Sequence, residues 1–389
     1  MKILALKKKI ISSDIGRFID EKLRILLSSI PLIHSIISLK NDNFKPDCFI
    51  LFLHGGIGDA LLTFPLIQRL SITHNVVVFC EKKIIGLDFL LPESVNLVEY
   101  EKNQLFQSKR QLKQRINSKH PLFVQTSPII EMYAVRWLLG ISNAIGLISN
   151  FSSIRSIGFD SDIQPLNAQS KADTYEKIYQ SIADKFIDKP SIFNPQLSIN
   201  KLKEDYAFIN EISQNYVVLS AMKTSEWQMG KMNKIEYAKL ADYLAEKYGQ
   251  QVVFVGDESE KLLVDNIIKL CKNNSHMINI SGRSNLRELS SILLNAQFII
   301  SNDSGIAHLA SFLQLKILVL FMFSDYKVYQ WNHRDYAFMF NKISDCMPCV
   351  KQSQYPKDNY PVDCPHQLVC NTSITSQSII HKIKELNWI

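Results

Sequence analysis

The chain has 389 residues, of which 46% are hydrophobic and 21% are charged. This length suits two or three domains with buried cores, and the modest charge content excludes a chain that is mainly disordered. The 13 glycines and 13 prolines are too few for a collagen-like or low-complexity chain. No apolar run reaches the roughly 18 residues that a transmembrane helix needs.

The net charge of +7 is concentrated at the N-terminus, where residues 1–45 carry nine basic and four acidic side chains. Apolar side chains recur every three or four residues from Ile15 to Ile30, which predicts an amphipathic helical extension. Basic residues beside such a stripe allow two interpretations: the helix packs on the main body, or it lies at a membrane interface. Because the rest of the chain has little excess charge, we expect no nucleic-acid partner.

From residue 48 onward, short apolar segments alternate with helical patterns. Strands are predicted over 48–53, 75–80 and 122–125, with helices over 59–70 and 129–139. Residues 150–200 are polar and contain three prolines, which favours an irregular region between two domains. No secretory signal is apparent near Lys7 to Lys9, so a cytoplasmic location is expected.

A second alternating series begins at Tyr216. Its predicted strands are 216–221, 251–255, 277–280, 298–301 and 316–321, and its predicted helices are 234–248, 258–271, 286–294, 305–312 and 376–386. Such alternation indicates parallel sheets, so the predicted fold class is α/β with two Rossmann-like, doubly wound domains that face a cleft. The predicted limits are 1–45 for the extension, 46–195 and 196–375 for the two domains, 344–372 for a cysteine-rich loop, and 376–389 for the last helix.

The first candidate site is the turn His-Gly-Gly-Ile-Gly-Asp at residues 54–59, which follows a strand and opens a helix. Gly56 and Gly58 allow another molecule to approach the backbone closely, and the helix N-terminus offers free N–H groups with a partial positive charge. Asp59 lies at the mouth of this helix, where a capping role is one interpretation.

The second candidate site is the segment from Ser301 to Ala310, which also joins a strand to a helix. Ser304 and Gly305 are expected to offer backbone N–H groups and a hydroxyl to a phosphate. His308 lies one turn into the helix, where it faces a ligand or bonds to the loop. Asp303 either caps the helix or orients the loop.

Two motifs carry a resemblance to a known family: Asp303-Ser304-Gly305-x-x-His308 and Gly55-Gly56-x-Gly58-Asp59. From about residue 48 to the C-terminus, the chain resembles the heptosyltransferase family of GT-B glycosyltransferases, glycosyltransferase family 9. The resemblance implies that the second domain binds a nucleotide-diphospho-sugar, typically ADP-heptose, and that the acceptor sugar docks on the first domain.

The resemblance also implies roles for individual residues. Asp59 matches the catalytic carboxylate, which takes the proton of the attacking acceptor hydroxyl. Ser304 and Gly305 match the loop that holds the diphosphate. Glu260 matches an acid that bonds the donor ribose, with Glu258 as its rival.

A cation is expected to neutralise the departing diphosphate. Lys231 is the candidate for this role and Lys223 is the alternative, because the Trp-Pro pair that usually follows the family's lysine is absent here. The loop from Asp303 to His308 is expected to share in holding the diphosphate, and Gly56 and Gly58 are expected close to the donor.

Four cysteines are clustered near the C-terminus with intervals of two, fourteen and five residues, namely Cys346, Cys349, Cys364 and Cys370. Four thiolates suit tetrahedral zinc or iron, and a short Cys-x-x-Cys pair is typical of a metal knuckle. Some members of the resembled family carry similar cysteines. A structural metal is therefore predicted, with His366 as a possible substitute ligand, against the alternative of free or partly disulfide-bonded cysteines.

The sequence thus predicts a glycosyltransferase that moves a sugar, with heptose preferred, from a nucleotide-diphosphate donor to a glycan or lipid-linked acceptor. Candidate acceptors are a lipopolysaccharide core, a capsule or a glycoprotein, and the expected location is cytoplasmic or peripheral on the inner membrane. Two alternatives stay open: a nucleotide-sugar epimerase of the same architecture, and a catalytically silent scaffold that uses the cysteine knuckle.

Overall fold

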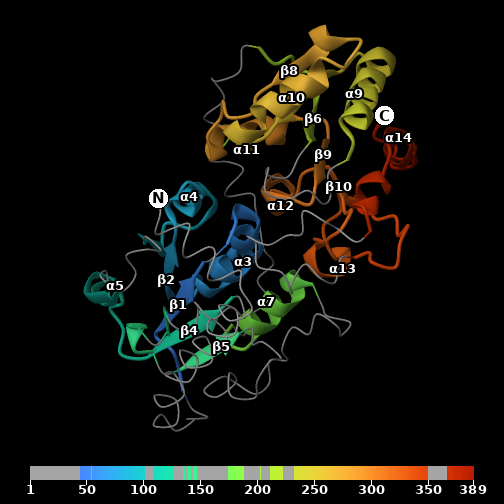
Figure 1. Ribbon diagram of the computed structural model, residues 1–389. Helices are drawn as coiled ribbons and strands as arrows, with labels where there is room; N and C mark the ends of the chain where they lie inside the picture. Colours follow the sequence, from blue (N-terminus) through green and yellow to red (C-terminus); the bar gives the residue numbers. More distant parts are fainter. Residues whose placement is uncertain are drawn as a thin grey trace, which may run out of the picture.

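The computed structural model describes residues 44–53, 55–100, 109–126, 135–136, 138–141, 143–146, 174–187, 202, 211–221, 232–348 and 366–389. The predicted N-terminal extension lies almost entirely outside these residues, as does most of the predicted helix over 129–139. Within them, two parallel sheets with helices around them form the fold (Figure 1). This confirms the predicted α/β class.

The first sheet has the strand order β3-β2-β1-β4-β5, and all of its pairings are parallel. Its strands are β1 (Cys48–Phe52), β2 (Asn75–Cys80), β3 (Val95–Glu99), β4 (Pro121–Gln125) and β5 (Ala144–Gly146). The sequence did not predict β3 or β5. The first alternates apolar and polar residues only briefly, and the second has three residues.

The second sheet has the order β11-β10-β9-β6-β7-β8, again with parallel pairings. Its strands are β6 (Tyr216–Ser220), β7 (Gln251–Val255), β8 (Met277–Asn279), β9 (Ile299–Asn302), β10 (Ile317–Leu320) and β11 (Tyr336–Met339). The strand order reverses between β6 and β9, and in the first sheet between β1 and β4. Ligands of doubly wound sheets bind at such reversals, beyond the carboxyl ends of the strands.

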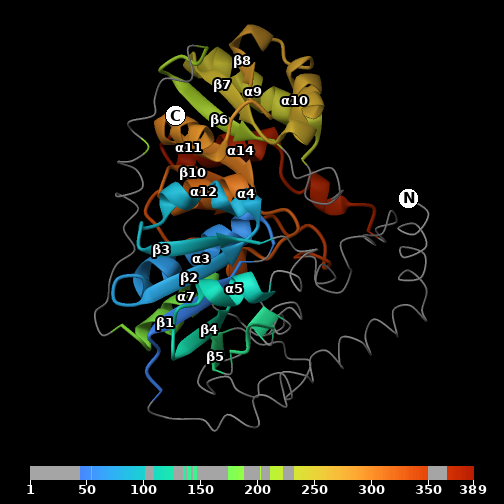
Figure 2. The same cartoon turned by 90° about the vertical axis from the view of Figure 1, so that its left-hand side faces the viewer.

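Helices cover both faces of each sheet. They are α3 (Ile57–Leu70), α4 (Lys82–Ile85), α5 (Lys109–Arg115), α7 (Tyr175–Asp184), α9 (Lys234–Tyr248), α10 (Lys261–Ile268), α11 (Leu286–Asn295), α12 (Gly305–Phe312), α13 (Tyr326–Tyr329) and α14 (Ser376–Glu385). Short 3-10 helices are η1 (Asp88–Leu90), η5 (Glu258–Glu260), η6 (Asn274–His276) and η9 (Val369–Thr372). Figure 2 shows α12, α4 and α3 in the region where the two sheets approach each other.

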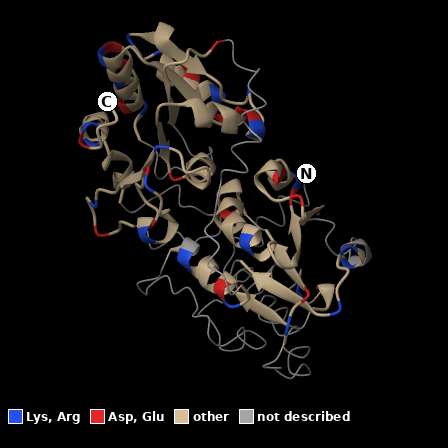
Figure 3. Cartoon of the chain, turned by 180° about the vertical axis from the view of Figure 1, so that it is seen from behind, with Lys and Arg blue, Asp and Glu red and all other residues tan. Residues whose placement is uncertain are grey.

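The central strands are buried at every position, and successive side chains face opposite sides of the sheet, as expected for sheets covered on both faces. Phe49 and Leu51 of β1 face the core formed with α3 and α7, whereas Ile50 faces a second core on the other side. The strands are almost without charged residues (Figure 3). One continuous hydrophobic cluster contains residues of both sheets, including Leu51 and Val218, so apolar packing joins the two halves.

The interpretation of residues 150–200 as wholly irregular is wrong, because α7 lies within them. Thr174 caps this helix by accepting a hydrogen bond from the backbone N–H of Lys177 at 3.3 Å. Tyr179 and Ile182 recur at helical spacing and are buried in the core that also contains α3. Because many polar residues surround this short apolar stripe, the sequence pattern did not indicate a helix here.

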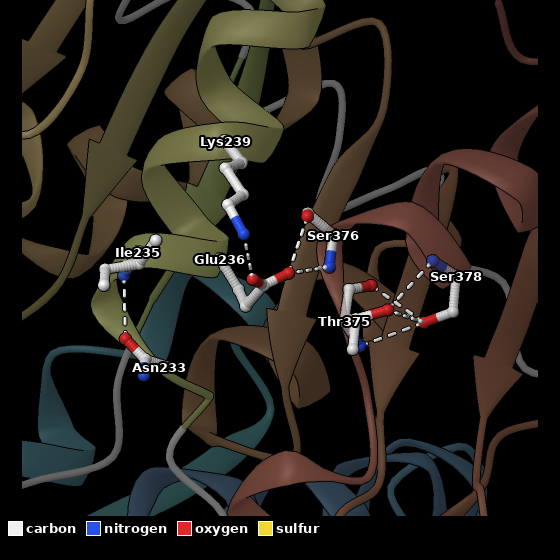
Figure 4. A network of polar contacts seen from close by, with 7 residues as sticks. All are labelled: Asn233, Ile235, Glu236, Lys239, Thr375, Ser376 and Ser378. Carbon is white, nitrogen blue, oxygen red and sulfur yellow. Dashed lines mark hydrogen bonds and ion pairs between the residues drawn. The ribbon is translucent and has the colours of Figure 1, made fainter.

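The C-terminal helix packs back onto α9 through a partly buried polar contact (Figure 4). One carboxylate oxygen of Glu236 accepts hydrogen bonds from the N–H and hydroxyl of Ser376, at 2.8 and 2.6 Å. Lys239 donates to the other oxygen at 2.8 Å. Burial alone raises the pKa of Glu236, but the hydrogen bonds from Lys239 and Ser376 outweigh it and lower this pKa to about 2.

The predicted domain limits stay a prediction, because much of the connection between the sheets lies outside the described residues. Among the helices that are described, none combines the length and the apolar character needed to cross a membrane.

Candidate active site

The two glycine turns of the sequence meet between the sheets. Helix α3 follows β1 and helix α12 follows β9, so both begin at the carboxyl ends of central strands. Their flanks contact each other, with the rings of Phe64 and Phe312 5.8 Å apart. A Cβ atom placed on Gly305 would lie 3.4 Å from Cβ of Ile57. The first turns of the two helices therefore lie directly beside each other.

Asp59 lies in the first turn of α3 and is exposed. It is not the N-cap, because Gly56 occupies that position; instead, Asp59 reaches back and accepts a hydrogen bond from the N–H of Gly56 at 2.8 Å. Gly55 has a φ of +103°, and a Cβ there would lie within 2.4 Å of the same Asp59 oxygen. The two glycines thus leave room for the Asp59 carboxylate, which lies at the N-terminus of α3 and is exposed.

Two tyrosines from different parts of the chain lie near Asp59. The rings of Tyr175 in α7 and Tyr329 in α13 are 5.6 Å apart, where Figure 1 shows α13 beside the end of α7. Burial, aided by the Asp59 charge, raises the pKa of Tyr175 to about 12. Burial also raises the pKa of Tyr329 well above its usual value, with Tyr175, Asp303 and Asp59 adding to the effect. Both phenols are therefore neutral at physiological pH.

Sequence reasoning missed these two tyrosines. Tyr175 falls in the segment interpreted as irregular, and Tyr329 belongs to a single helical turn without a motif. The helical spacing of Tyr175, Ile178, Tyr179 and Ile182 was the available signal for α7.

Ser304 caps α12, since its hydroxyl accepts a hydrogen bond from the N–H of Ala307 at 3.4 Å. The proposal that Asp303 caps this helix is therefore wrong. Its carboxylate oxygen Oδ1 instead lies 3.5 Å from Nε2 of His308. The other ring nitrogen of His308 accepts a hydrogen bond from the indole N–H of Trp331 at 2.9 Å. His308 is thus held by the protein on one side and faces Asp303 on the other.

Glu260 and its rival Glu258 occupy different environments. Glu260 is buried, and its Oε2 accepts a hydrogen bond from the N–H of Asp257 at 3.0 Å. A Cβ on Gly256, directly after β7, would lie 2.4 Å from this oxygen. The side chain of Glu258 is 72% exposed and forms an ion pair with Lys261 at 3.8 Å. Of the two acids, Glu260 is therefore the one that is enclosed by the protein next to the end of β7.

The remaining predicted site residues are only partly visible. Lys231, Lys223, Cys349 and Cys364 lie outside the described residues. Cys346 and Cys370 contribute to one small apolar cluster with Phe323 and Met347. In the part of the chain that is described, no group of three or more metal-binding side chains is found.

The chain has recognisable relatives. The family described as Glycosyltransferase family 9 (heptosyltransferase) matches residues 155–358, slightly more than half of the chain. Lipooligosaccharide heptosyltransferase 2 of Haemophilus ducreyi is 32% identical over 77 residues, which are 19% of this chain. That match spans only 22% of the relative's own length.

Solved structures share the architecture. A glycosyltransferase family 9 protein from Veillonella parvula has a TM-score of 0.63 at 13% identity, covering 88% of this chain and 97% of its own. E. coli ADP-heptose lps heptosyltransferase II has a TM-score of 0.62 at 15% identity, with 87% and 98% covered. TibC, an iron-containing dodecameric glycosyltransferase from enterotoxigenic E. coli, has a TM-score of 0.54 at 14% identity, with 88% and 76% covered.

These structural likenesses establish the two-sheet GT-B fold, and the family match covers the segment that contains the Asp303–His308 loop. The chain therefore belongs to glycosyltransferase family 9, the heptosyltransferase family.

Proposed function

We propose that this protein transfers a heptose from ADP-heptose to a bacterial surface glycan, with Asp59 as the general base. The observation that carries the proposal is the meeting of the two turns, which brings an exposed carboxylate to the same space as the start of α12. The named substrates of the relatives support the donor: E. coli ADP-heptose lps heptosyltransferase II has this fold, and a TibC complex contains ADP-D-beta-D-heptose.

In the proposed reaction, the acceptor hydroxyl attacks the anomeric carbon of the donor sugar. Asp59 takes the hydroxyl proton while the bond between the anomeric carbon and the diphosphate oxygen breaks, and ADP leaves with the electron pair. The backbone N–H groups at Ser304 and Gly305 and the positive end of the α12 dipole stabilise the charge that develops on the diphosphate. Lys231, or alternatively Lys223, would add a cation.

For the rest of the donor, we assign Glu260 to the ribose. A carboxylate can accept hydrogen bonds from ribose hydroxyls, and such charge-assisted bonds are stronger than neutral ones. The burial of Glu260 next to the end of β7 supports this assignment. Glu258 is a weaker candidate, because its carboxylate is solvated and paired with Lys261.

The four cysteines Cys346, Cys349, Cys364 and Cys370 are proposed to hold a structural zinc or iron. Two observations support this: Cys346 and Cys370 share one apolar cluster, although they lie 24 positions apart in the sequence, and TibC is iron-containing. The metal would stabilise the loop and take no part in the reaction. Metal analysis of the purified protein should find close to one equivalent, and less than about 0.2 equivalents would contradict the assignment.

The basic extension is proposed to bring the enzyme to the cytoplasmic face of the inner membrane, where lipid-linked acceptors are available. Its nine basic side chains would be attracted to anionic lipids. Sedimentation with anionic and neutral liposomes tests this proposal. Equal recovery from both, with and without residues 1–45, would refute it.

Asp59→Asn tests the proposed base with little structural change, because the amide oxygen can still accept the Gly56 hydrogen bond. Turnover should fall about 10²- to 10⁴-fold while ADP affinity is unchanged. Asp88→Asn is the matched control, since Asp88 is an exposed first-domain carboxylate that accepts a local backbone N–H at 2.8 Å. Unchanged turnover of Asp59→Asn would refute the assignment.

The nucleotide is tested separately by thermal shift with ADP-, GDP- and UDP-sugars. A shift with ADP-sugars alone is expected. Conversion of the donor without an acceptor would point to an epimerase, and no shift with any nucleotide would point to a scaffold.

A further inference from the structure

Helix α9 is tied to the end of strand β9 by a buried hydrogen bond. The phenol of Tyr237 donates to Oδ1 of Asn302 at 2.9 Å, and both side chains are buried. Burial raises the pKa of Tyr237 above its usual range, with the hydrogen bond to Asn302 opposing this shift and the charge of Glu260 adding to it, so the phenol keeps its hydrogen at physiological pH. Asn302 directly precedes Asp303, where the loop begins that is proposed to hold the diphosphate.

The start of this loop contains a chain of hydrogen bonds in which each hydrogen has one acceptor. The hydroxyl of Ser301 donates to the carbonyl of Asn302 at 2.8 Å, so its oxygen can only accept from the hydroxyl of Ser304, 3.1 Å away. The Ser304 oxygen in turn accepts a hydrogen bond from the N–H of Ala307. Asn302 is therefore held at its side chain by Tyr237 and at its carbonyl by Ser301, which also holds Ser304.

Tyr237 also connects this loop with the N-terminus of α9. Its own N–H donates to the carbonyl of the N-cap residue Asn233 at 3.2 Å, so the phenol belongs to the first turn of the helix. Lys231, the candidate cation, precedes that cap by two positions in the sequence. One side chain thus joins the helix that follows the candidate cation to the strand end that precedes the loop.

We infer that Tyr237 is a positioning residue for the Asp303–His308 loop and acts through Asn302. This inference rests on the proposed function for the identity of the ligand, whereas the contacts do not depend on it. Without the phenol hydroxyl, the buried Oδ1 of Asn302 loses this donor, which favours other arrangements of the strand end. Because the diphosphate is proposed to bind only when Ser304 and Gly305 are in place, a lower population of that arrangement weakens ADP binding.

Tyr237→Phe removes the hydroxyl and keeps the ring. Loss of one hydrogen bond of ordinary strength should weaken ADP binding about three- to tenfold in calorimetric titration. Tyr216→Phe is the matched control, because Tyr216 is also buried and its phenol donates to the carbonyl of Ile292 at 2.6 Å. Tyr216 begins β6, which runs parallel to β9, so it lies at the end of the sheet away from the loop. The control should lose a similar amount of stability and bind ADP normally.

Hydrogen–deuterium exchange tests the positioning without any ligand. The N–H groups of Asp303, Ala307 and His308 all donate hydrogen bonds, so exchange in the segment that contains them reports the order of the loop. This exchange should be faster in Tyr237→Phe than in wild type and unchanged in Tyr216→Phe. Asn302→Ala removes the acceptor of the same bond and should show the same acceleration. If neither Tyr237→Phe nor Asn302→Ala accelerates the exchange relative to the control, the inference is overturned, even if one of the two folds poorly.

A double-mutant cycle tests whether Tyr237 acts through Asn302. The double variant Tyr237→Phe/Asn302→Ala should bind ADP no more weakly than Asn302→Ala alone, because the bond is already absent. Additive losses, or an ADP affinity of Tyr237→Phe equal to that of Tyr216→Phe, would overturn the inference. If the wild-type protein binds no ADP, the proposed function fails, whereas the exchange rates still decide whether Tyr237 positions the loop.

Discussion

Gly58→Ala is a demanding test of the contact between α3 and α12. The new Cβ would lie 2.6 Å from Cδ2 of His308, whereas carbon atoms normally pack at about 3.5 to 4.0 Å. About 1 Å of movement is therefore required. The imidazole must turn away from Trp331, or the two helices must separate.

The cost follows from this overlap. Overpacking of this kind typically costs about 1 to 3 kcal/mol, and the better helix propensity of alanine returns up to about 1 kcal/mol. The expected net loss in the free energy of unfolding is about 1 to 2 kcal/mol. Because His308 belongs to the Asp303–His308 loop that is proposed to hold the diphosphate, ADP affinity should also fall about tenfold.

Urea denaturation measures the stability and calorimetric titration measures the ADP affinity. Gly86→Ala is the control, since Gly86 has a φ of −61° and its Cβ would lie at an ordinary 3.5 Å from Cδ1 of Leu286. That variant should bind ADP normally and be as stable as wild type or slightly more stable. A Gly58→Ala protein with wild-type stability and ADP affinity would refute the close contact.

Three further predictions concern titration and donor binding. Burial lowers the pKa of His333 to about 4, so between about pH 6.5 and pH 4 the unfolded chain binds more protons than the folded one, and the free energy of unfolding falls on acidification. His333→Phe should remove about 2 to 3 kcal/mol of that loss, measured by urea denaturation at several pH values. An unchanged pH profile of stability would contradict this prediction. Glu236 has a folded-state pKa of about 2, so its contribution to the free energy of unfolding is present above about pH 4.5 and is lost toward pH 2. Glu236→Gln should therefore lower the free energy of unfolding by about 1 to 3 kcal/mol at pH 7, whereas Glu385→Gln, which removes an exposed ion pair, should lower it little. Glu260→Gln should weaken ADP binding about tenfold and Glu258→Gln should not, as judged by calorimetry; the opposite order would exchange their roles.

Most central strands could be predicted because they are buried on both faces and are therefore nearly continuous apolar runs. The edge strands β3, β5 and β11 could not, although β8, at the edge of the second sheet, was predicted. β11 is only partly buried along its length, and β5 is too short to show a pattern. Helix ends were accurate where the cap is a recognised residue, as with Asn233 before α9 and Ser304 before α12.

The candidate site was predictable only where a local motif marked it. The two turns could be found because glycine and a helix N-terminus have a known relation to phosphates. That the turns meet depends on the packing of α3 against α12, which no short segment encodes. The contact of Trp331 with His308 was missed for the same reason, since they lie 23 positions apart in the chain.

The most direct test of the proposed activity is mass spectrometry of acceptor glycans after incubation with ADP-heptose and the full-length protein. The acceptors should include truncated lipooligosaccharide cores as well as capsule and glycoprotein precursors. One of them should gain the mass of one heptose as ADP is released, and Asp59→Asn should slow this gain about 10²- to 10⁴-fold without weakening ADP binding. An ADP-heptose donor that is converted without any acceptor, or equal transfer by Asp59→Asn, would contradict the proposed mechanism.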